Sequence, residues 1–169
     1  MFVVEQNKIQ RVYKINKSFL LSEFLHNFVL MPRRDIFHEK FKTALLKEGW
    51  NVTNDPLFVP TEGGVNFFID LGAEKIIGAE KEGELIAIEI KSFDENSISY
   101  SFYEILGQFL VYEIALIEQL KLWTLYIAMS KLGFKKLDEM PVFRKAIVKY
   151  KLKFIIFDPV NQLIIEWKK

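Results

Sequence analysis

Apolar and polar residues alternate with a period of two along residues 84–91. The three isoleucines of this segment fall on one parity, and Glu89 and Lys91 fall on the other. Because successive side chains of a β-strand point to opposite faces, the pattern predicts a strand whose two charged residues share one face. We expect this strand to be central in its sheet. Leu85 and Ala87 should also be buried, since a helix is expected to cover their face.

The spacing becomes helical over residues 35–49, where Phe37, Phe41 and Leu45 form one apolar stripe. A long helix is predicted at 99–119 and a short one at 142–150. Strands are predicted at 51–59, 65–71, 74–80, 84–92, 122–129, 153–157 and 162–167. Pro56 indicates an edge or a break in the first strand. The spacing of the strands between 65 and 92 favours a meander, and the last two strands favour a hairpin.

The composition is that of a packed globule of one domain. The chain has 169 residues, half of them apolar, and 16 are phenylalanine. There are no cysteines, which excludes disulfides and thiolate metal sites and fits a cytoplasmic protein. The most apolar stretch, 109–129, is interrupted by four charged or amide residues, so no membrane span is predicted. With a formal net charge of +1, any contact with DNA must come from a local patch.

Three side chains suggest chemistry. Asp70 ends a short apolar run at 65–70, and Glu89 and Lys91 end the alternating strand eighteen residues further on. Two carboxylates and a lysine at neighbouring strand ends would suit a hard divalent metal and a phosphate. The alternative is that Glu89 and Lys91 form an ordinary ion pair on a half-exposed strand.

The same residues occupy the motif positions of the PD-(D/E)xK nuclease superfamily, which the chain resembles although Ile69 stands where the name has proline. Six further blocks carry a narrower resemblance: RRDIFHE at 33–39, GW at 49–50, DPL at 55–57, DLGAE at 70–74, EIKSF at 89–93 and EILGQF at 104–109. In these blocks the chain resembles the XisH family, whose members are described as controlling factors for excision of the fdxN DNA element. It implies an α/β fold with a restriction-endonuclease-like core, in which helices flank a mixed β-sheet.

The resemblance also implies residue roles. Asp70, Glu89 and the main-chain carbonyl of Ile90 would hold one Mg²⁺ or Mn²⁺, and Lys91 would orient the attacking water or stabilise the transition state. In resolvase-like members of the superfamily an acid on the first helix approaches the metal. Glu39 is the corresponding acid on the predicted first helix of this chain. In the alternative, Glu39 is a solvated residue with no role at the metal.

Gln108 and Tyr112 lie four residues apart on the predicted long helix, so they share a face. This spacing resembles the Gln-x-x-x-Tyr motif of RecB-like nucleases, which contacts the substrate strand or supports the site. In the alternative, Tyr112 is a core aromatic residue and Gln108 bonds to the main chain.

The resemblance implies a Mg²⁺-dependent DNA endonuclease that takes part in excising a DNA element. The alternative is a non-catalytic accessory or regulatory protein that acts with a XisI-like partner; a homo-oligomer is left open. Residues 31–169 would form a single endonuclease-like domain. Residues 1–30 would be an extension that is not native and derives from an upstream start, or else a strand and helix packed on the domain.

Overall fold

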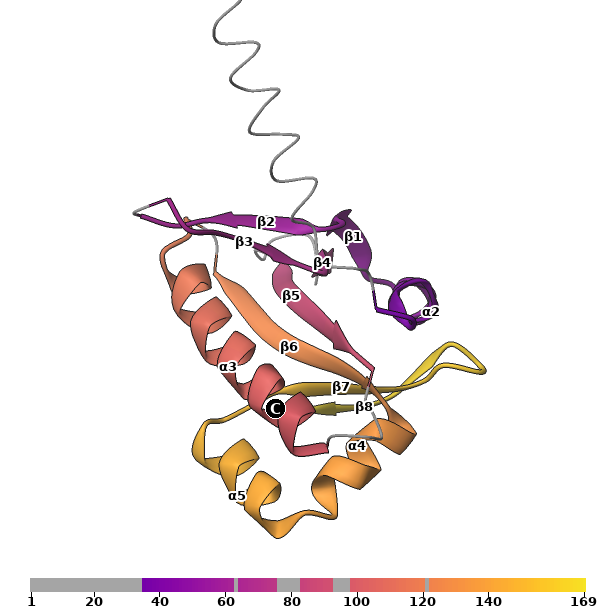
Figure 1. Cartoon of the computed structure of the whole chain (residues 1–169). Helices are drawn as coiled ribbons and strands as arrows, with labels where there is room; N and C mark the ends of the chain where they lie inside the picture. The colour runs from indigo at the N-terminus through magenta and orange to yellow at the C-terminus, as the bar shows by residue number, and fades with distance from the viewer. Residues whose placement is uncertain (1–34, 63, 76–82, 93–97, 121) are drawn as a thin grey trace, which may run out of the picture. The chain divides into compact units, whose positions relative to one another are not determined.

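The computed structural model describes residues 35–62, 64–75, 83–92, 98–120 and 122–169 (Figure 1). The predicted N-terminal extension, 1–30, lies outside the described residues. The described helices are α2 (His38–Lys47), α3 (Ile98–Ile117), α4 (Lys131–Asp138) and α5 (Pro141–Lys149). The described strands are β1 (Asn51–Asn54), β2 (Leu57–Pro60), β3 (Asn66–Ile69), β4 (Leu71–Lys75), β5 (Glu84–Lys91), β6 (Trp123–Ser130), β7 (Phe154–Asp158) and β8 (Leu163–Lys168).

Six strands form one mixed sheet in the order β1-β4-β5-β6-β7-β8. β5, β6 and β7 run parallel, and the outer neighbours β4 and β8 are antiparallel to them. The central position predicted for β5 is therefore confirmed. Ala87 is fully buried, as predicted. Leu85 is only half-buried, because it lies near the start of β5, opposite the first residue of β6.

Helices cover both faces of this sheet, so the predicted mixed sheet with flanking helices is confirmed (Figure 1). On one face, Phe41 and Leu45 of α2 pack in a cluster with the three isoleucines of β5. On the other face, the buried side of α3 packs with Ala87 and with apolar residues of β6 and β7. Among the described residues, no helix combines the length and the apolarity that crossing a membrane requires.

The segment 51–75 differs from its prediction. The first predicted strand is two strands, β1 and β2, separated at Pro56. β2 and β3 form a separate two-stranded sheet, so the predicted meander is wrong for its first strand. Its other two strands, β4 and β5, pair antiparallel as neighbours in the large sheet. The strand predicted at 74–80 begins earlier, at Leu71, because the chain bends at Asp70 and joins the large sheet at once. The rest of that prediction, 76–80, lies outside the described residues.

The second half of the chain follows its prediction with one addition. The long helix, the strand that follows it, the short helix and the C-terminal hairpin are confirmed. The helix α4 was not predicted. The Ser130 side chain caps it by accepting a hydrogen bond from the Gly133 main-chain N–H at 3.1 Å. Its buried residues Gly133, Phe134 and Leu137 have helical spacing, which is the signal that could have revealed it.

Candidate functional site

Asp70 lies in the bend between β3 and β4, where the chain passes from the small sheet to the large one. Its Oδ2 atom accepts a hydrogen bond from the main-chain N–H of Ile90 at 2.7 Å. Because Ile90 is the penultimate residue of β5, this bond holds the Asp70 carboxylate at the carboxyl-terminal end of that strand.

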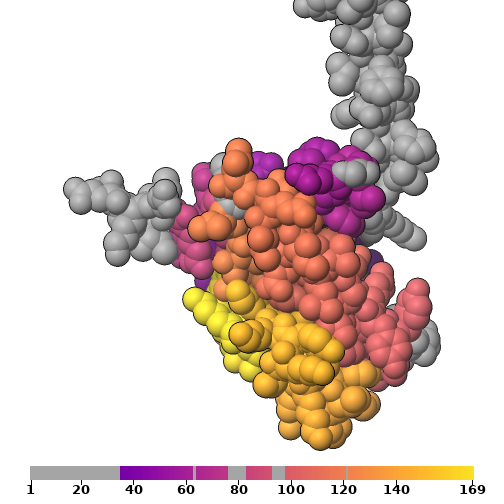
Figure 2. All heavy atoms as spheres, turned by 90° about the vertical axis from the view of Figure 1, so that its left-hand side faces the viewer, coloured from indigo at the N-terminus to yellow at the C-terminus, as the bar shows by residue number. Residues whose placement is uncertain are grey.

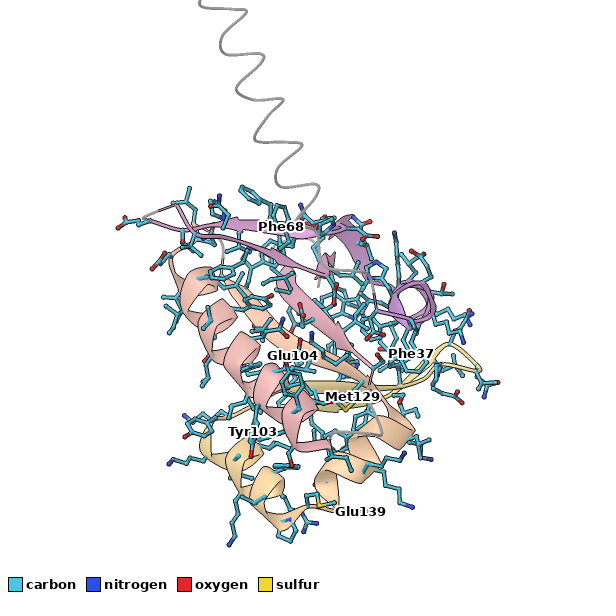
Figure 3. All side chains as sticks on the ribbon, in the orientation of Figure 1. Phe37, Phe68, Tyr103, Glu104, Met129 and Glu139 are labelled. Carbon is cyan, nitrogen blue, oxygen red and sulfur yellow. The ribbon has the colours of Figure 1, made fainter. Side chains whose placement is uncertain are left out.

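Glu89 and Lys91 share a face of β5, as the alternation predicted. This is the face of Ala87, which α3 covers. The Lys91 Nζ atom lies 3.0 Å from Glu89 Oε1 and 4.0 Å from Oε1 of Glu104, which belongs to α3 (Figure 3). The Glu89–Lys91 ion pair therefore exists. It does not lie on a half-exposed strand, however, since Glu89 is 8% exposed.

Burial dominates the electrostatics of Glu89. Burial is the largest cause that raises the pKa of this carboxyl group, and the charge of the nearby Asp70 carboxylate is the next, while Lys91 opposes both effects. The net result is a rise in the pKa of Glu89 from 4.5 to about 7. The pKa of Asp70 is also raised by burial. The hydrogen bond from Ile90 and the charges of His38 and Lys91 oppose that rise. Ionisation is therefore disfavoured at both the half-buried Asp70 and the buried Glu89, and Lys91 contacts Glu89.

Gln108 and Tyr112 come together beside these acids, on the face that their spacing predicted. Burial raises the pKa of the Tyr112 hydroxyl, and the charges of Glu89 and Asp70 raise it further, while a hydrogen bond with Gln108 lowers it. Tyr112 is also a core residue, because it is 7% exposed and its ring centroid lies 5.5 Å from that of Phe67. Both predicted interpretations of Tyr112 therefore agree with its position.

Three buried side-chain atoms within the described part of the chain make no hydrogen bond: Glu89 Oε2, Gln108 Oε1 and His38 Nδ1. A buried polar atom without a partner costs free energy, so each needs an explanation. For Glu89, a bound hard divalent cation would be such an explanation, since it would coordinate the Oε2 atom and offset the repulsion between the Glu89 and Asp70 carboxylates. The donor set of two carboxylates therefore fits Mg²⁺ or Mn²⁺. That the main-chain carbonyl of Ile90 is a third ligand of the metal remains a prediction from the resemblance.

The first helix, α2, carries Glu39 and His38 close together. Glu39 is exposed, and its carboxylate belongs to a second group, with His38 and Asp55, whose ligand atoms lie within 4.8 Å of one another. His38 was not proposed as a functional residue, yet it is 3% exposed and its charge acts on Asp70. Its Nε2 atom lies 2.9 Å from Asp55 Oδ1, and Asp55 Oδ2 accepts from Lys42 Nζ at 2.6 Å. The position of His38 three residues before buried Phe41 is the signal that could have revealed its burial.

The family model described as XisH protein matches residues 31–165. Two solved structures are similar to the chain. One is an XisH family protein from Nostoc punctiforme, 35% identical with a TM-score of 0.68, and the other is an fdxN element excision controlling factor protein from Anabaena variabilis, 34% identical with a TM-score of 0.69. Both comparisons cover 80% of this chain and 100% of the relative. No curated protein matches. The chain belongs to the XisH family.

Proposed function

We propose that this protein is a metal-dependent DNA endonuclease that takes part in excising a DNA element. One observation carries the proposal: Asp70 and the buried, incompletely hydrogen-bonded Glu89 lie together beside Lys91. Buried carboxyl groups with raised pKa values are typical of functional sites.

The residues have distinct roles in this proposal. Asp70 and Glu89 hold the divalent ion together with the carbonyl of Ile90. A bound ion supplies a water of lowered pKa and neutralises charge on the scissile phosphate. Lys91 donates a hydrogen bond to the attacking water or to a non-bridging phosphate oxygen, where negative charge increases in the transition state. The water oxygen bonds to phosphorus and the water gives up a proton to the solvent, while the bond from phosphorus to the leaving oxygen breaks and the leaving oxygen takes up a proton from the solvent.

The relative from Anabaena variabilis is named for control of fdxN element excision, and we extend that role to this chain. Removing an element from DNA requires phosphodiester bonds to be cut, which suits a nuclease. We further propose that β4, β5, β6 and β7, with α2 and α3, form a restriction-endonuclease-like core. The antiparallel β4–β5 pair continued by two parallel strands supports this assignment.

The test is cleavage of linear, single-stranded and branched DNA by purified protein in Mg²⁺, Mn²⁺ or EDTA. Wild type should cut in the presence of metal, whereas Lys91→Ala should bind metal and fail to cut. Mg²⁺ or Mn²⁺ should raise the melting temperature of both proteins by mass action, and Asp70→Asn should abolish this rise. Cleavage that persists in EDTA or in Lys91→Ala would contradict the proposal.

A second function is favoured by the outer face of α3, which is uncovered along its length (Figure 2). Tyr100, Tyr103, Ile114 and Ile117 are each at least 62% exposed on this helix. Exposed apolar side chains on one element are typical of a surface that binds another protein. A non-catalytic accessory protein with a XisI-like partner is therefore the alternative. It would be supported if no DNA is cut and no metal raises the melting temperature.

A further inference from the structure

The three parallel strands of the large sheet end at the same edge (Figure 1). β5 ends at Lys91, β6 at Ser130 and β7 at Asp158, and α4 starts directly after Ser130. In sheets of this kind, ligands are bound in the crevice outside the carboxyl ends of the strands. Lys91 is the last residue of β5, so a ligand at this edge would lie beside the end of the strand that carries Glu89 and Lys91.

Two adjoining cavities open at this edge. The larger has a volume of about 430 Å³, and the smaller has a volume of about 140 Å³. Both are lined by Phe37, Ser130 and Leu132, so we describe them together as the strand-end hollow. In the view of Figure 3, Phe37 lies between α2 and the turn that joins β7 to β8.

The strand-end hollow combines an apolar floor with a basic rim. The rim contains Lys131 and Lys135 in the larger cavity and Lys136 in the smaller one. Lys135 is 71% exposed, and its 3.9 Å pair with Glu139 is a weak surface interaction. The one acid on the lining, Asp158, accepts hydrogen bonds from residues of its own turn.

Apolar and aromatic surface inside a basic rim suits single-stranded nucleic acid. Bases that have left a stack pack on aromatic and apolar side chains, while lysines contact the flanking phosphates. A base inside a regular duplex cannot enter such a hollow, because it is stacked and paired. Phe37, Leu132 and Val160 supply the apolar surface here.

The hollow lies close to the proposed site of cleavage. Ser92, which lines the smaller cavity, directly follows Lys91, and its main-chain N–H donates to Asp35 Oδ2. Lys91, the last residue of β5, pairs in register with Met129, so Ser92 follows β5 next to Ser130, the last residue of β6. Neighbouring strands of a sheet lie about 5 Å apart. The hollow therefore adjoins the end of β5.

We propose that the strand-end hollow binds an unpaired nucleotide of the substrate strand next to the bond that is cut. The preferred substrate is then single-stranded or locally unpaired DNA, and not a regular duplex. The position relative to the cut rests on the proposed function, whereas binding of the unpaired nucleotide does not.

The test is binding without cleavage. Fluorescence anisotropy in EDTA compares a short labelled single strand with a blunt duplex of the same sequence. Wild type should bind the single strand at least about tenfold more tightly. The double variant Lys131→Ala/Lys135→Ala should lose about tenfold in affinity. The slope of the logarithm of its binding constant against the logarithm of the salt concentration should become shallower by about 0.7 for each lost phosphate contact. Leu132→Asp, a change at a side chain that is 62% exposed, should weaken binding without unfolding the domain.

The matched control is Lys145→Ala/Lys149→Ala, which removes two exposed lysines of α5 that do not line the hollow. Its affinity should equal that of wild type. Equal binding of single strand and duplex, or an equal loss in the control, would overturn the inference. Cleavage is assayed separately in metal, so a protein that binds through the hollow but never cuts would refute only the proposed function. If wild type cuts DNA and the Lys131→Ala/Lys135→Ala variant binds normally, only the inference fails.

Discussion

Replacing Glu89 by glutamine tests the physical basis of the candidate site without any substrate. The side chain is 8% exposed and its Oε2 atom makes no hydrogen bond, so ionising it in the folded protein is unfavourable. The glutamine side chain has nearly the same shape and cannot ionise. Glu89→Gln should therefore remove the pH dependence that this group gives to the stability of the metal-free protein.

The raised pKa sets both the sign and the size of the effect. Between the ordinary value of 4.5 and the folded value of about 7, the folded protein retains a proton that the unfolded chain has released. Stability therefore falls as the pH rises through this range, at up to about 1.4 kcal/mol per pH unit. Over the whole range the free energy of unfolding falls by about 3 kcal/mol, and the Glu89→Gln protein should lack this part of the fall.

Urea denaturation in EDTA, from about pH 5 to about pH 8, measures the difference between the two proteins. Glu113→Gln is the matched control, because Glu113 is exposed on the same helix that covers Glu89 and its replacement changes the same chemical group. The wild-type curve should fall relative to the Glu89→Gln curve and stay parallel to the control. If the curves of wild type and Glu89→Gln are parallel, Glu89 ionises without cost in the folded protein and the reasoning from burial is refuted.

Three further substitutions test the packing around the site, each by urea denaturation. His38→Ala should lower the free energy of unfolding by about 1–3 kcal/mol, because it removes a buried hydrogen bond to Asp55; no change would mean that this bond contributes nothing. Gly107→Ala should raise it by up to about 1 kcal/mol, because nothing beyond the adjacent residues and the helix's own backbone lies within 4 Å of the added Cβ and glycine is a poor helix former; a loss of stability would contradict this. Gly72→Ala should lower it by about 1–3 kcal/mol, because the added Cβ would lie 3.1 Å from Asn54 Oδ1; wild-type stability would show that the neighbours adjust freely.

Local patterns determined the elements that are strongly periodic. The alternation in β5 was enough to predict both the strand and the shared face of Glu89 and Lys91, because the side-chain direction in a strand depends only on position. The same holds for Gln108 and Tyr112, which one helix places on one face. The short helix α4 escaped prediction because its apolar residues cover barely two turns, and its cap acts only once Ser130 has ended β6.

The sequence by itself therefore determined which side chains share a face of one element: Glu89 with Lys91, and Gln108 with Tyr112. Only the tertiary structure decided which elements meet. The bend at Asp70, the separation of β2 and β3 from the large sheet, and the burial of His38 all depend on contacts between residues distant in the chain. The tertiary structure also decided the raised pKa of Glu89, because its burial and its nearness to the Asp70 carboxylate arise only when strands and helix pack together. It likewise decided the strand-end hollow, since the hollow exists only where three parallel strands end side by side.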